Sequence, residues 1–394
     1  MLKKKSVRDF DLKGKRVLIR ADFNVPLDDK LNITDDTRIR AALPTVKYVL
    51  DGGGSVILMS HLGRPKGEVK EELRLTPVAD RLSKLLKKDV KRLNDCIGSG
   101  VKEAVSAIKP GDVILLENLR FHKEETKNDP SFAKELASLG DIYVNDAFGT
   151  CHRAHASTEG VTKFLPAASG FLVEKEIEYF ERLIQNPEKP YIAILGGAKV
   201  SDKIQVFERL MDNVDTILIG GAMAYTFLKS QGIGVGGSKL ESDKLDLAKS
   251  ILENARKKNV NLVLPIDHIV ADKLANDANT KEVGREIPDG LIGLDIGTKT
   301  IDKFKEILKG AKTVVWNGPV GFFEMDKFSN GTREIARFLA GSKATTVIGG
   351  GDTAAAIMNL GLQDKMSHIS TGGGASLEYL EGKVLPGVAA LNDK

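Results

Sequence analysis

The sequence predicts an α/β protein with two domains, each built on a doubly wound parallel sheet. The chain has 394 residues, which is more than one hydrophobic core usually supports, so two domains are expected. Its apolar runs are short, β-branched and continuously hydrophobic, and amphipathic helical patterns separate them. Strands of this kind are typical of parallel sheets that helices cover on both faces.

The composition limits the classes of function that the protein could have. Hydrophobic residues make up 42% of the chain and charged residues 28%, as is ordinary for a globular protein, and the net charge of +4 gives no indication of nucleic-acid or membrane binding. No apolar run reaches transmembrane length, and no signal peptide follows the lysine-rich start, so a cytoplasmic protein is expected. Cys96 and Cys151 are too few for a disulfide framework or a zinc site.

Polar and basic side chains follow the strands expected in the first half. These strands lie in the runs 16–25, 55–65, 112–122 and 141–155. The carboxyl ends of parallel strands meet at one edge of a sheet, where ligands bind. The residues that follow or adjoin these ends are Asp22, Asn24, Arg38, His61, Arg64, Arg120, His122, His152 and Arg153. One surface arginine is usually a solvated charge, but several at one edge suit a small, highly anionic ligand.

The strands expected in the second half end mainly in glycine. They lie in the runs 191–200, 216–225, 261–270, 313–323 and 345–354. The glycines concerned are Gly196, Gly197, Gly220, Gly221, Gly318, Gly321, Gly349, Gly350 and Gly351. Glycine turns that open onto helices let phosphates approach backbone N–H groups. The second half is therefore predicted to bind a nucleotide.

A helix is expected between the two halves, at 171–185. Val173, Ile177, Phe180 and Ile184 recur at helical spacing, and a proline-containing exit follows at 187–190. The expected domains are thus 1–170, which accepts the anion, and 186–374, which binds the nucleotide. Half-sites on separate domains imply a hinge, because closure would assemble the site and exclude water.

Two lysines lie beside the glycine turn after the first strand of the second half. Ser201 is positioned to cap the next helix, which places Lys203 in its first turn, where the helix dipole disfavours a cation. Lys199 lies four residues earlier. A bound polyanion would explain both lysines. The alternative is that they are solvated and that Asp202 moderates their charge.

Asp352 has two interpretations at this stage. An aspartate between a strand and the run TAAAI is a typical helix N-cap. Capping does not require three preceding glycines, however, and a carboxylate beside a phosphate-binding turn could hold Mg²⁺. The segment 369–380 repeats the triple glycine, and 316–324 adds Pro319 and the carboxylate of Glu324.

The sequence lacks the characteristic motifs of several enzyme classes. The sequence has neither the P-loop motif nor the protein-kinase motif set. Its G-x-G-x-x-G match at Gly232, Gly234 and Gly237 follows a helical pattern rather than a strand, which argues against a dinucleotide site. His152 and His155 have no third metal ligand nearby in sequence. A nicotinamide dehydrogenase and a non-catalytic nucleotide-binding protein remain as alternatives from the residues alone.

The motifs taken together resemble the phosphoglycerate kinase family, in its order and along nearly the whole chain. The first half carries RADFNVP (20–26), ITDDTRIRAALP (33–44), SHLGRPKG (60–67), LLENLRFHKEE (115–125) and VNDAFGTCHRAHAS (144–157). The second half carries GGAKVSDKI (196–204), GGAMAYTF (220–227), LDIGTKT (294–300), WNGPVGFFE (316–324), GGGDTA (349–354) and STGGGASLE (370–378). No motif position departs from the family pattern.

The resemblance implies a kinase of glycolysis and gluconeogenesis that reversibly transfers a phosphoryl group between 1,3-bisphosphoglycerate with MgADP and 3-phosphoglycerate with MgATP. It implies two Rossmann-like domains in a monomer, with Mg²⁺ bound alongside ATP or ADP. The partners would be these small molecules, with no nucleic acid and no membrane. The family returns its C-terminal segment to the first domain, which implies that 375–394 joins 1–170 and that STGGG belongs to the hinge.

The resemblance also implies roles for single residues. Phosphoglycerate would be bound by Asp22, Phe23, Asn24, Arg38, His61, Leu62, Gly63, Arg64, Arg120 and Arg153. The nucleotide would be bound by Lys199, Lys203, Gly221, Gly293, Asn317, Pro319, Glu324 (on the ribose), Gly350, Gly351, Asp352 (on Mg²⁺) and Thr353. Catalysis would use Arg38, Lys199, Lys203 and Gly373. The acceptor is a carboxylate that is already ionised at neutral pH, so no general base is required.

Overall fold

The computed structural model describes residues 4–394, which form two compact units. The first unit holds the described residues up to Glu178 together with Val384–Lys394, and the second holds Tyr179–Lys383. The division lies within helix α6 (Phe171–Gln185), whose bounds agree with the helix expected from the sequence. The C-terminal return begins at Val384, nine residues after the position that the family resemblance implied.

The first unit contains a six-stranded parallel sheet in the order β3-β4-β2-β1-β5-β6. Its strands are β1 (Arg16–Ala21), β2 (Ser55–Met59), β3 (Val90–Arg92), β4 (Val113–Leu115), β5 (Ile142–Asp146) and β6 (Ala167–Ser169). The chain leaves β1 toward β2 on one side and later returns on the other side as β5. Ligands bind at such a reversal in strand order, outside the carboxyl ends of the strands.

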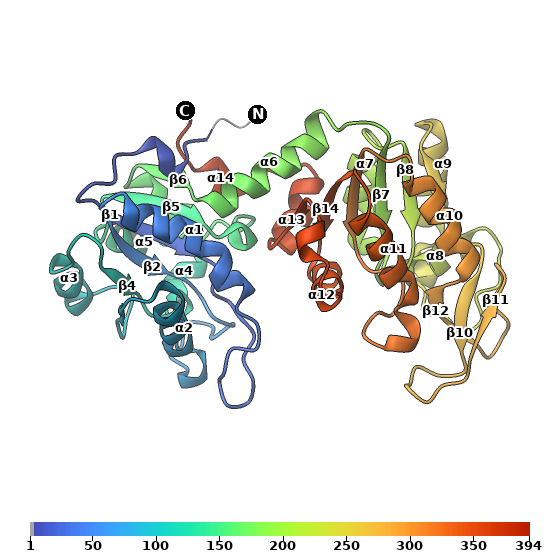
Figure 1. The fold of residues 1–394 in the computed structure, drawn as a ribbon, viewed down its shortest axis with the longest axis horizontal. Coiled ribbons are helices and arrows are strands. Elements are labelled where there is room, and N and C mark those ends of the chain that lie inside the picture. The colour runs from blue at the N-terminus through green and yellow to red at the C-terminus, as the bar shows by residue number, and fades with distance from the viewer. Residues whose placement is uncertain (1–3) are drawn as a thin grey trace. The chain divides into compact units, whose positions relative to one another are not determined.

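Helices cover both faces of this sheet (Figure 1). They are α1 (Thr37–Asp51), α2 (Thr76–Leu86), α3 (Ser99–Ser106), α4 (Lys123–Thr126), α5 (Pro130–Ala137) and α14 (Pro386–Ala389). Strand side chains alternate between faces, so Val17 and Ile19 join one buried cluster, with α1 and α2. Leu18 joins the other, with α3 and α5. Because both faces of the sheet are buried, its strands are apolar at consecutive positions.

The second unit contains a six-stranded parallel sheet in the order β15-β14-β13-β7-β8-β9. Its strands are β7 (Tyr191–Leu195), β8 (Thr216–Ile219), β9 (Asn261–Val263), β13 (Thr313–Asn317), β14 (Thr345–Gly349) and β15 (His368–Ile369). Ile192 and Ile194 pack with α10, α11 and α12. Tyr191 and Ala193, which point the other way, are also fully buried, so both faces of β7 are covered.

One or two helices follow each strand of this sheet except β9, which leads into further strands (Figure 1). The helices of the second unit are α7 (Ile204–Leu210), α8 (Met223–Ser230), α9 (Leu245–Lys257), α10 (Thr298–Leu308), α11 (Asn330–Ala340), α12 (Gly351–Asn359) and α13 (Gly374–Leu380). The fold class expected from the sequence, α/β with two doubly wound parallel sheets, is thus confirmed. No helix within residues 4–394 combines the length and the apolar character that a membrane span requires.

A third, antiparallel sheet was not expected from the sequence. It has the order β11-β10-β12, formed by β10 (His268–Ala271), β11 (Thr280–Val283) and β12 (Ile292–Ile296). The run 261–270 was predicted as a single strand, which is wrong. Pro265 lies in the middle of that run, lacks an N–H donor and separates β9 from β10.

The loop with the G-x-G-x-x-G spacing packs against this small sheet. It follows α8, as the sequence indicated, and Val235 bridges to Ile287. Gly236 has φ +53°, and a Cβ there would lie 2.4 Å from the carbonyl oxygen of Leu291. Within the spacing itself, Gly232 has φ +83°, and a Cβ on Gly234 would lie 2.8 Å from Glu286 Oε1, so these two glycines have a structural reason that involves no dinucleotide.

Candidate active site

The loops after β1 and β2 are tied together at the edge of the first sheet. Asp22 Oδ2 accepts a hydrogen bond from Arg38 Nη1 at 3.0 Å, and Asp22 Oδ1 accepts one from the Asn24 N–H at 3.2 Å. Asn24 Oδ1 in turn accepts from the Gly63 N–H at 2.8 Å. Gly63 has φ +63°, and a Cβ there would lie 2.7 Å from a methyl carbon of Leu73, so this position favours glycine.

Phe23 and Leu62 point into the core rather than to the edge of the sheet. Their exposed fractions are 0% and 2%, and both belong to the cluster beneath α1 and α2. The Phe23 N–H donates to Ser60 Oγ at 2.8 Å, and the Leu62 N–H donates to Asn118 Oδ1 at 3.2 Å. These two residues therefore hold the loops in place through packing and backbone hydrogen bonds.

Cationic side chains from several loops gather in one cavity of about 460 Å³. Its lining consists of Arg64, Lys66, Gly67, Arg120, His122, Lys123, Thr126, Lys127 and Arg153. Arg120 Nη1 donates to the Gly63 carbonyl at 2.8 Å, whereas the buried Arg120 Nε has no hydrogen-bond partner in the described chain. Burial and the neighbouring cations Arg20 and Arg153 lower the pKa of Arg120 to about 10. A site with this charge favours an anion with several oxygens.

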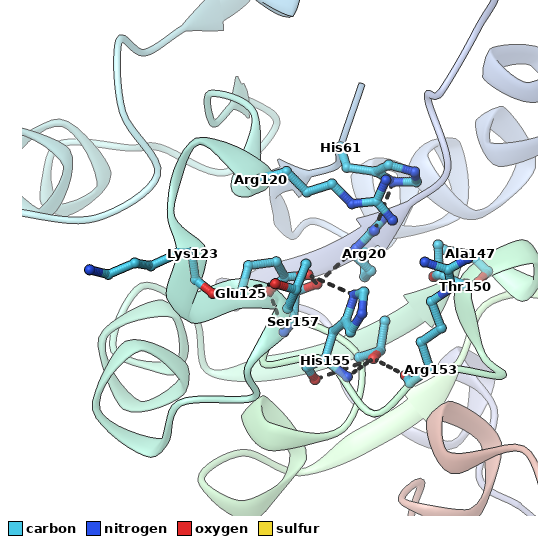
Figure 2. A network of polar contacts seen from close by, with 12 residues as sticks. Arg20, His61, Arg120, Lys123, Glu125, Ala147, Thr150, Arg153, His155 and Ser157 are labelled. Atoms are coloured by element: carbon cyan, nitrogen blue, oxygen red, sulfur yellow. Dashed lines mark hydrogen bonds and ion pairs between the residues drawn. The ribbon is translucent and has the colours of Figure 1, made fainter. Parts of the chain in front are cut away.

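A buried polar network lies beneath these cations (Figure 2). Arg20 Nε donates to Ser157 Oγ at 2.9 Å, and Ser157 Oγ donates to Glu125 Oε1 at 2.6 Å. Arg20 and Glu125 are both 0% exposed. Sequence reasoning missed this group, although an arginine inside the otherwise apolar run of β1 is a signal that could have pointed to it.

The two histidines beside this network are neutral. His61 Nδ1 lies 3.1 Å from Arg20 Nη2. Burial, followed by the positive charges of Arg20, Arg120 and Arg38, holds the pKa of His61 well below its usual value. Burial and the same kind of cationic surroundings lower the pKa of His155 to about 4. Neither ring therefore adds charge to the site at neutral pH.

Lys203 lies at the edge of the second sheet. It ends a 3₁₀ turn (Ser201–Lys203) and directly precedes α7, so it is not within the first turn of an α-helix. Ser201 does not cap that helix, because its hydroxyl donates to Glu241 instead. The Lys203 ammonium donates to Asn317 Oδ1. Burial lowers the pKa of Lys203 to about 8, against the opposing effect of Asp202 and Asp352. Lys199 is exposed.

The turn between β14 and α12 is open. A Cβ on Gly351 would have no atom within 4 Å, and Gly350 has φ +86°. A Cβ on Gly350 would lie 3.3 Å from Asn317 Nδ2, which is buried and has no hydrogen-bond partner among residues 4–394. Gly350 is the N-cap of α12, so Asp352, which is exposed in the first turn, does not cap the helix. The capping interpretation of Asp352 was therefore wrong.

Other glycines of the second unit serve packing rather than an open turn. A Cβ on Gly196 would lie 2.1 Å from the Pro319 carbonyl oxygen, and one on Gly221 would lie 2.6 Å from the Gly197 nitrogen. The Gly318 N–H donates to Thr353 Oγ1 at 2.7 Å. The turns after β7, β8 and β13 thus contact one another through backbone. Close backbone packing accounts for these glycines, so the prediction that glycines make room for phosphates stays a prediction for the open turn between β14 and α12.

The remaining expected nucleotide residues lie in three places. Gly293 is in β12, where its N–H donates to Ser238 Oγ at 2.9 Å. Glu324 is exposed and lines a cavity of about 290 Å³ with Asn359, at the end of α12. Gly373 has φ +51° and is the N-cap of α13, with nothing within 4 Å of a Cβ.

A cationic cavity at one parallel sheet, and a buried lysine beside an open glycine turn at the other, fit an α/β phosphotransferase. The phosphoglycerate kinase family model matches residues 7–383. The chain is 56% identical to the phosphoglycerate kinase of Chlorobium limicola, over 100% of both chains. It is 59% identical to that of Synechococcus elongatus, over 97% of this chain and 96% of the relative.

Solved structures agree with these relatives. The structure of phosphoglycerate kinase from Coxiella burnetii matches with a TM-score of 0.90 at 44% identity, over 98% of both chains. The chain belongs to the phosphoglycerate kinase family. It is a phosphotransferase with a carboxyl group as acceptor, and it transfers a phosphoryl group reversibly between 1,3-bisphosphoglycerate with ADP and 3-phosphoglycerate with ATP. The dehydrogenase and the non-catalytic alternatives are thereby set aside.

Proposed function

We propose that the first unit binds the phosphoglycerate and the second binds the nucleotide. The observation that carries this proposal is the cavity in the first unit, whose charged lining residues are all cationic or histidine. A substrate with a phosphate and a carboxylate complements that charge. The side chains that would bind it are Asp22, Asn24, Arg38, His61, Arg64, Arg120 and Arg153, with Phe23, Leu62 and Gly63 contributing backbone.

In the second unit, the nucleotide phosphates would meet Lys199, Lys203 and the open turn at Gly350 and Gly351. The unpartnered amide of Asn317 beside this turn supports the assignment, because it is a buried donor that a phosphate oxygen would satisfy. Thr353, Pro319, Gly221 and Gly293 would complete the pocket, and Gly373 would act on the transferring group. Glu324 would bind the ribose at the far end of α12 from Asp352, about 10 Å along a helix of this length.

The residues at the open turn fit a Mg²⁺ ion that arrives with the nucleotide. Mg²⁺ is commonly held by one or two carboxylates together with substrate phosphates. Asp352 offers an exposed carboxylate, and it lies near enough to Lys203 to act on the pKa of that lysine. Asp352 would therefore hold the ion, which neutralises negative charge on the phosphates when bound.

The residues of the chain would act mainly by position and charge. Phosphoryl transfer leaves little covalent work to a protein, and the carboxylate acceptor needs no general base. Arg38 would approach the transferring group, since its side chain is 37% exposed although Asp22 holds one edge of its guanidinium. The neutral His61 would donate a hydrogen bond without adding charge. We further propose that the enzyme works as a cytoplasmic monomer, as the family resemblance implies.

Calorimetry on two variants tests the assignment of substrates to units. Arg120→Gln should weaken 3-phosphoglycerate binding at least tenfold and leave ADP binding unchanged, because its guanidinium lies only in the first unit's cavity. Lys203→Gln should weaken ADP binding at least tenfold and leave 3-phosphoglycerate binding unchanged. The proposal would be wrong if either variant weakened both ligands equally. Light scattering of the purified enzyme tests the monomer.

A further inference from the structure

Glu125 is a fully buried carboxylate to which the proposed function gives no role. It lies in α4 and is 0% exposed. Its Oε2 accepts from the Ser157 N–H at 3.0 Å and its Oε1 from the Ser157 hydroxyl at 2.6 Å. His155 Nδ1 lies 3.8 Å from Oε1. A buried carboxylate is costly unless it offsets a charge, so a nearby cation is expected to be its partner.

That cation is Arg20, which reaches Glu125 through the serine hydroxyl. Arg20 Nε donates to Ser157 Oγ at 2.9 Å, and Arg20 Nη1 donates to the backbone carbonyl of the next residue, Ala21. Its remaining nitrogen, Nη2, lies 3.1 Å from His61 Nδ1. Figure 2 shows Glu125, Ser157 and Arg20 pointing toward one another, with His61 beyond the arginine.

This chain of contacts fixes the state of His61. A guanidinium can only donate, so His61 Nδ1 must accept from Arg20. In a neutral ring the proton then resides on Nε2. Arg20 is 0% exposed, so it does not contact a ligand directly, and its contact with His61 links it to the edge of the sheet. His61 is 4% exposed and follows β2 at the edge of the sheet where the other candidate residues lie.

We propose that Glu125 is a positioning residue for the acceptor substrate, acting through Ser157 and Arg20 to present His61 as a neutral donor with its proton on Nε2. The proposal rests on the proposed function, in which His61 contacts phosphoglycerate. Glu125 provides the negative charge that keeps the buried Arg20 in place. Arg20 in turn selects one of the two neutral forms of His61.

The test compares Glu125→Gln with Glu124→Gln. Both changes remove one negative charge from α4, but Glu124 is only half-buried and has no side-chain hydrogen bond within residues 4–394. Glu125→Gln should raise KM for 3-phosphoglycerate roughly 10- to 100-fold, as loss of a residue that orients a binding group does. KM for ATP should stay within about twofold of the original enzyme. Glu124→Gln should change neither.

A spectroscopic measurement reads the network without turnover. In ¹⁵N-histidine-labelled enzyme, the ring signals of His61, assigned by their loss in His61→Gln, should report a single neutral Nε2–H form from pH 6 to pH 8. Ser157→Ala removes the hydroxyl that joins Arg20 to Glu125 and replaces a buried side chain by a smaller one. It should produce a mixture of the two neutral forms. Ser157→Ala also provides the test of the network if Glu125→Gln does not fold.

Three results would overturn the proposal. One is an unchanged His61 signal in both Glu125→Gln and Ser157→Ala. The second is an unchanged KM for 3-phosphoglycerate in these variants. The third is an equal rise of both KM values, which would indicate a general structural role. If His61→Gln itself binds 3-phosphoglycerate normally, the proposed contact of His61 with substrate fails, whereas the ¹⁵N signals still report on the network.

Discussion

Arg38 Nη1 donates a hydrogen bond to Asp22 Oδ2 at 3.0 Å, joining the first turn of α1 to the loop after β1. A cation in the first turn of a helix is disfavoured by the helix dipole, and the Asp22 carboxylate offsets that charge. Asp22 itself is largely buried, with 10% of its side chain exposed against 37% for Arg38. The carboxylate thus orients the guanidinium while leaving part of it available to a ligand.

Arg38→Ala should lower kcat by about 10³- to 10⁵-fold, the range found for arginines that stabilise a transferring phosphoryl group. Calorimetric binding of 3-phosphoglycerate and of ADP should change much less, because other cations remain. The matched control is Arg40→Ala, since Arg40 lies two residues away, is more exposed and pairs with Asp36. A variant lacking Arg38 that keeps its kcat would contradict the role, as would an equal loss on removing Arg40.

Lys203 should make nucleotide binding dependent on pH. Its pKa, lowered to about 8 by burial, means that the free enzyme loses this positive charge as the pH rises through 8. ADP affinity, measured without Mg²⁺, should therefore fall between pH 7 and pH 9. In Lys203→Ala the affinity should be low at every pH and the fall should be absent. Lys258→Ala, an exposed lysine paired with Asp212, should keep the original profile. A persistent fall in Lys203→Ala would assign the titration to another group.

Asp352→Asn should weaken the dependence of activity on Mg²⁺ while leaving 3-phosphoglycerate binding intact. Because Gly350 and not Asp352 occupies the N-cap of α12, the amide should not destabilise the helix through a lost cap. The measurement is a Mg²⁺ titration of kcat at saturating substrates, with Asp364→Asn as a control at an aspartate in a separate 3₁₀ turn. Superimposable Mg²⁺ curves for Asp352→Asn and the original enzyme would show that Asp352 does not hold the metal.

The sequence predicted the parallel sheets because their strands are continuously apolar, and periodicity predicted α6 to the residue. It did not predict the β10–β12 sheet, whose strands are short and, in β11, exposed. The sequence pointed to the arginines of the first unit because they follow or adjoin the carboxyl ends of strands, and a parallel sheet brings those ends to one edge. Glu125 and Ser157 are the last residues of the motifs at 115–125 and 144–157, but the sequence gives them no role, and only the tertiary fold places them beside Arg20. Glycine alone could not distinguish an open turn from close backbone packing, as at Gly196.

Asp146 should make the stability of the first unit depend on pH. This buried carboxylate ends β5 and contacts the start of α6, where its Oδ1 accepts from the Leu172 N–H at 2.9 Å and the Val173 N–H at 3.4 Å. A Cβ on Gly170 would lie 2.2 Å from the same oxygen. Burial raises the pKa of Asp146 from 3.8 to about 7, although these hydrogen bonds oppose the rise.

The sign of the effect follows from proton uptake. Because the folded state holds this proton more tightly than the unfolded chain, the contribution to unfolding free energy is full below about pH 4 and is lost as the pH rises to about 7. The loss is at most about 4 kcal/mol. Asp146→Asn cannot ionise, so calorimetric melting should show the variant gaining stability relative to the original enzyme between pH 5 and pH 8. Asp51→Asn, at an exposed residue ending α1, should show no such gain. A constant difference between Asp146→Asn and the original enzyme across this range would mean that the carboxyl is ionised throughout, held so by its hydrogen bonds to the start of α6.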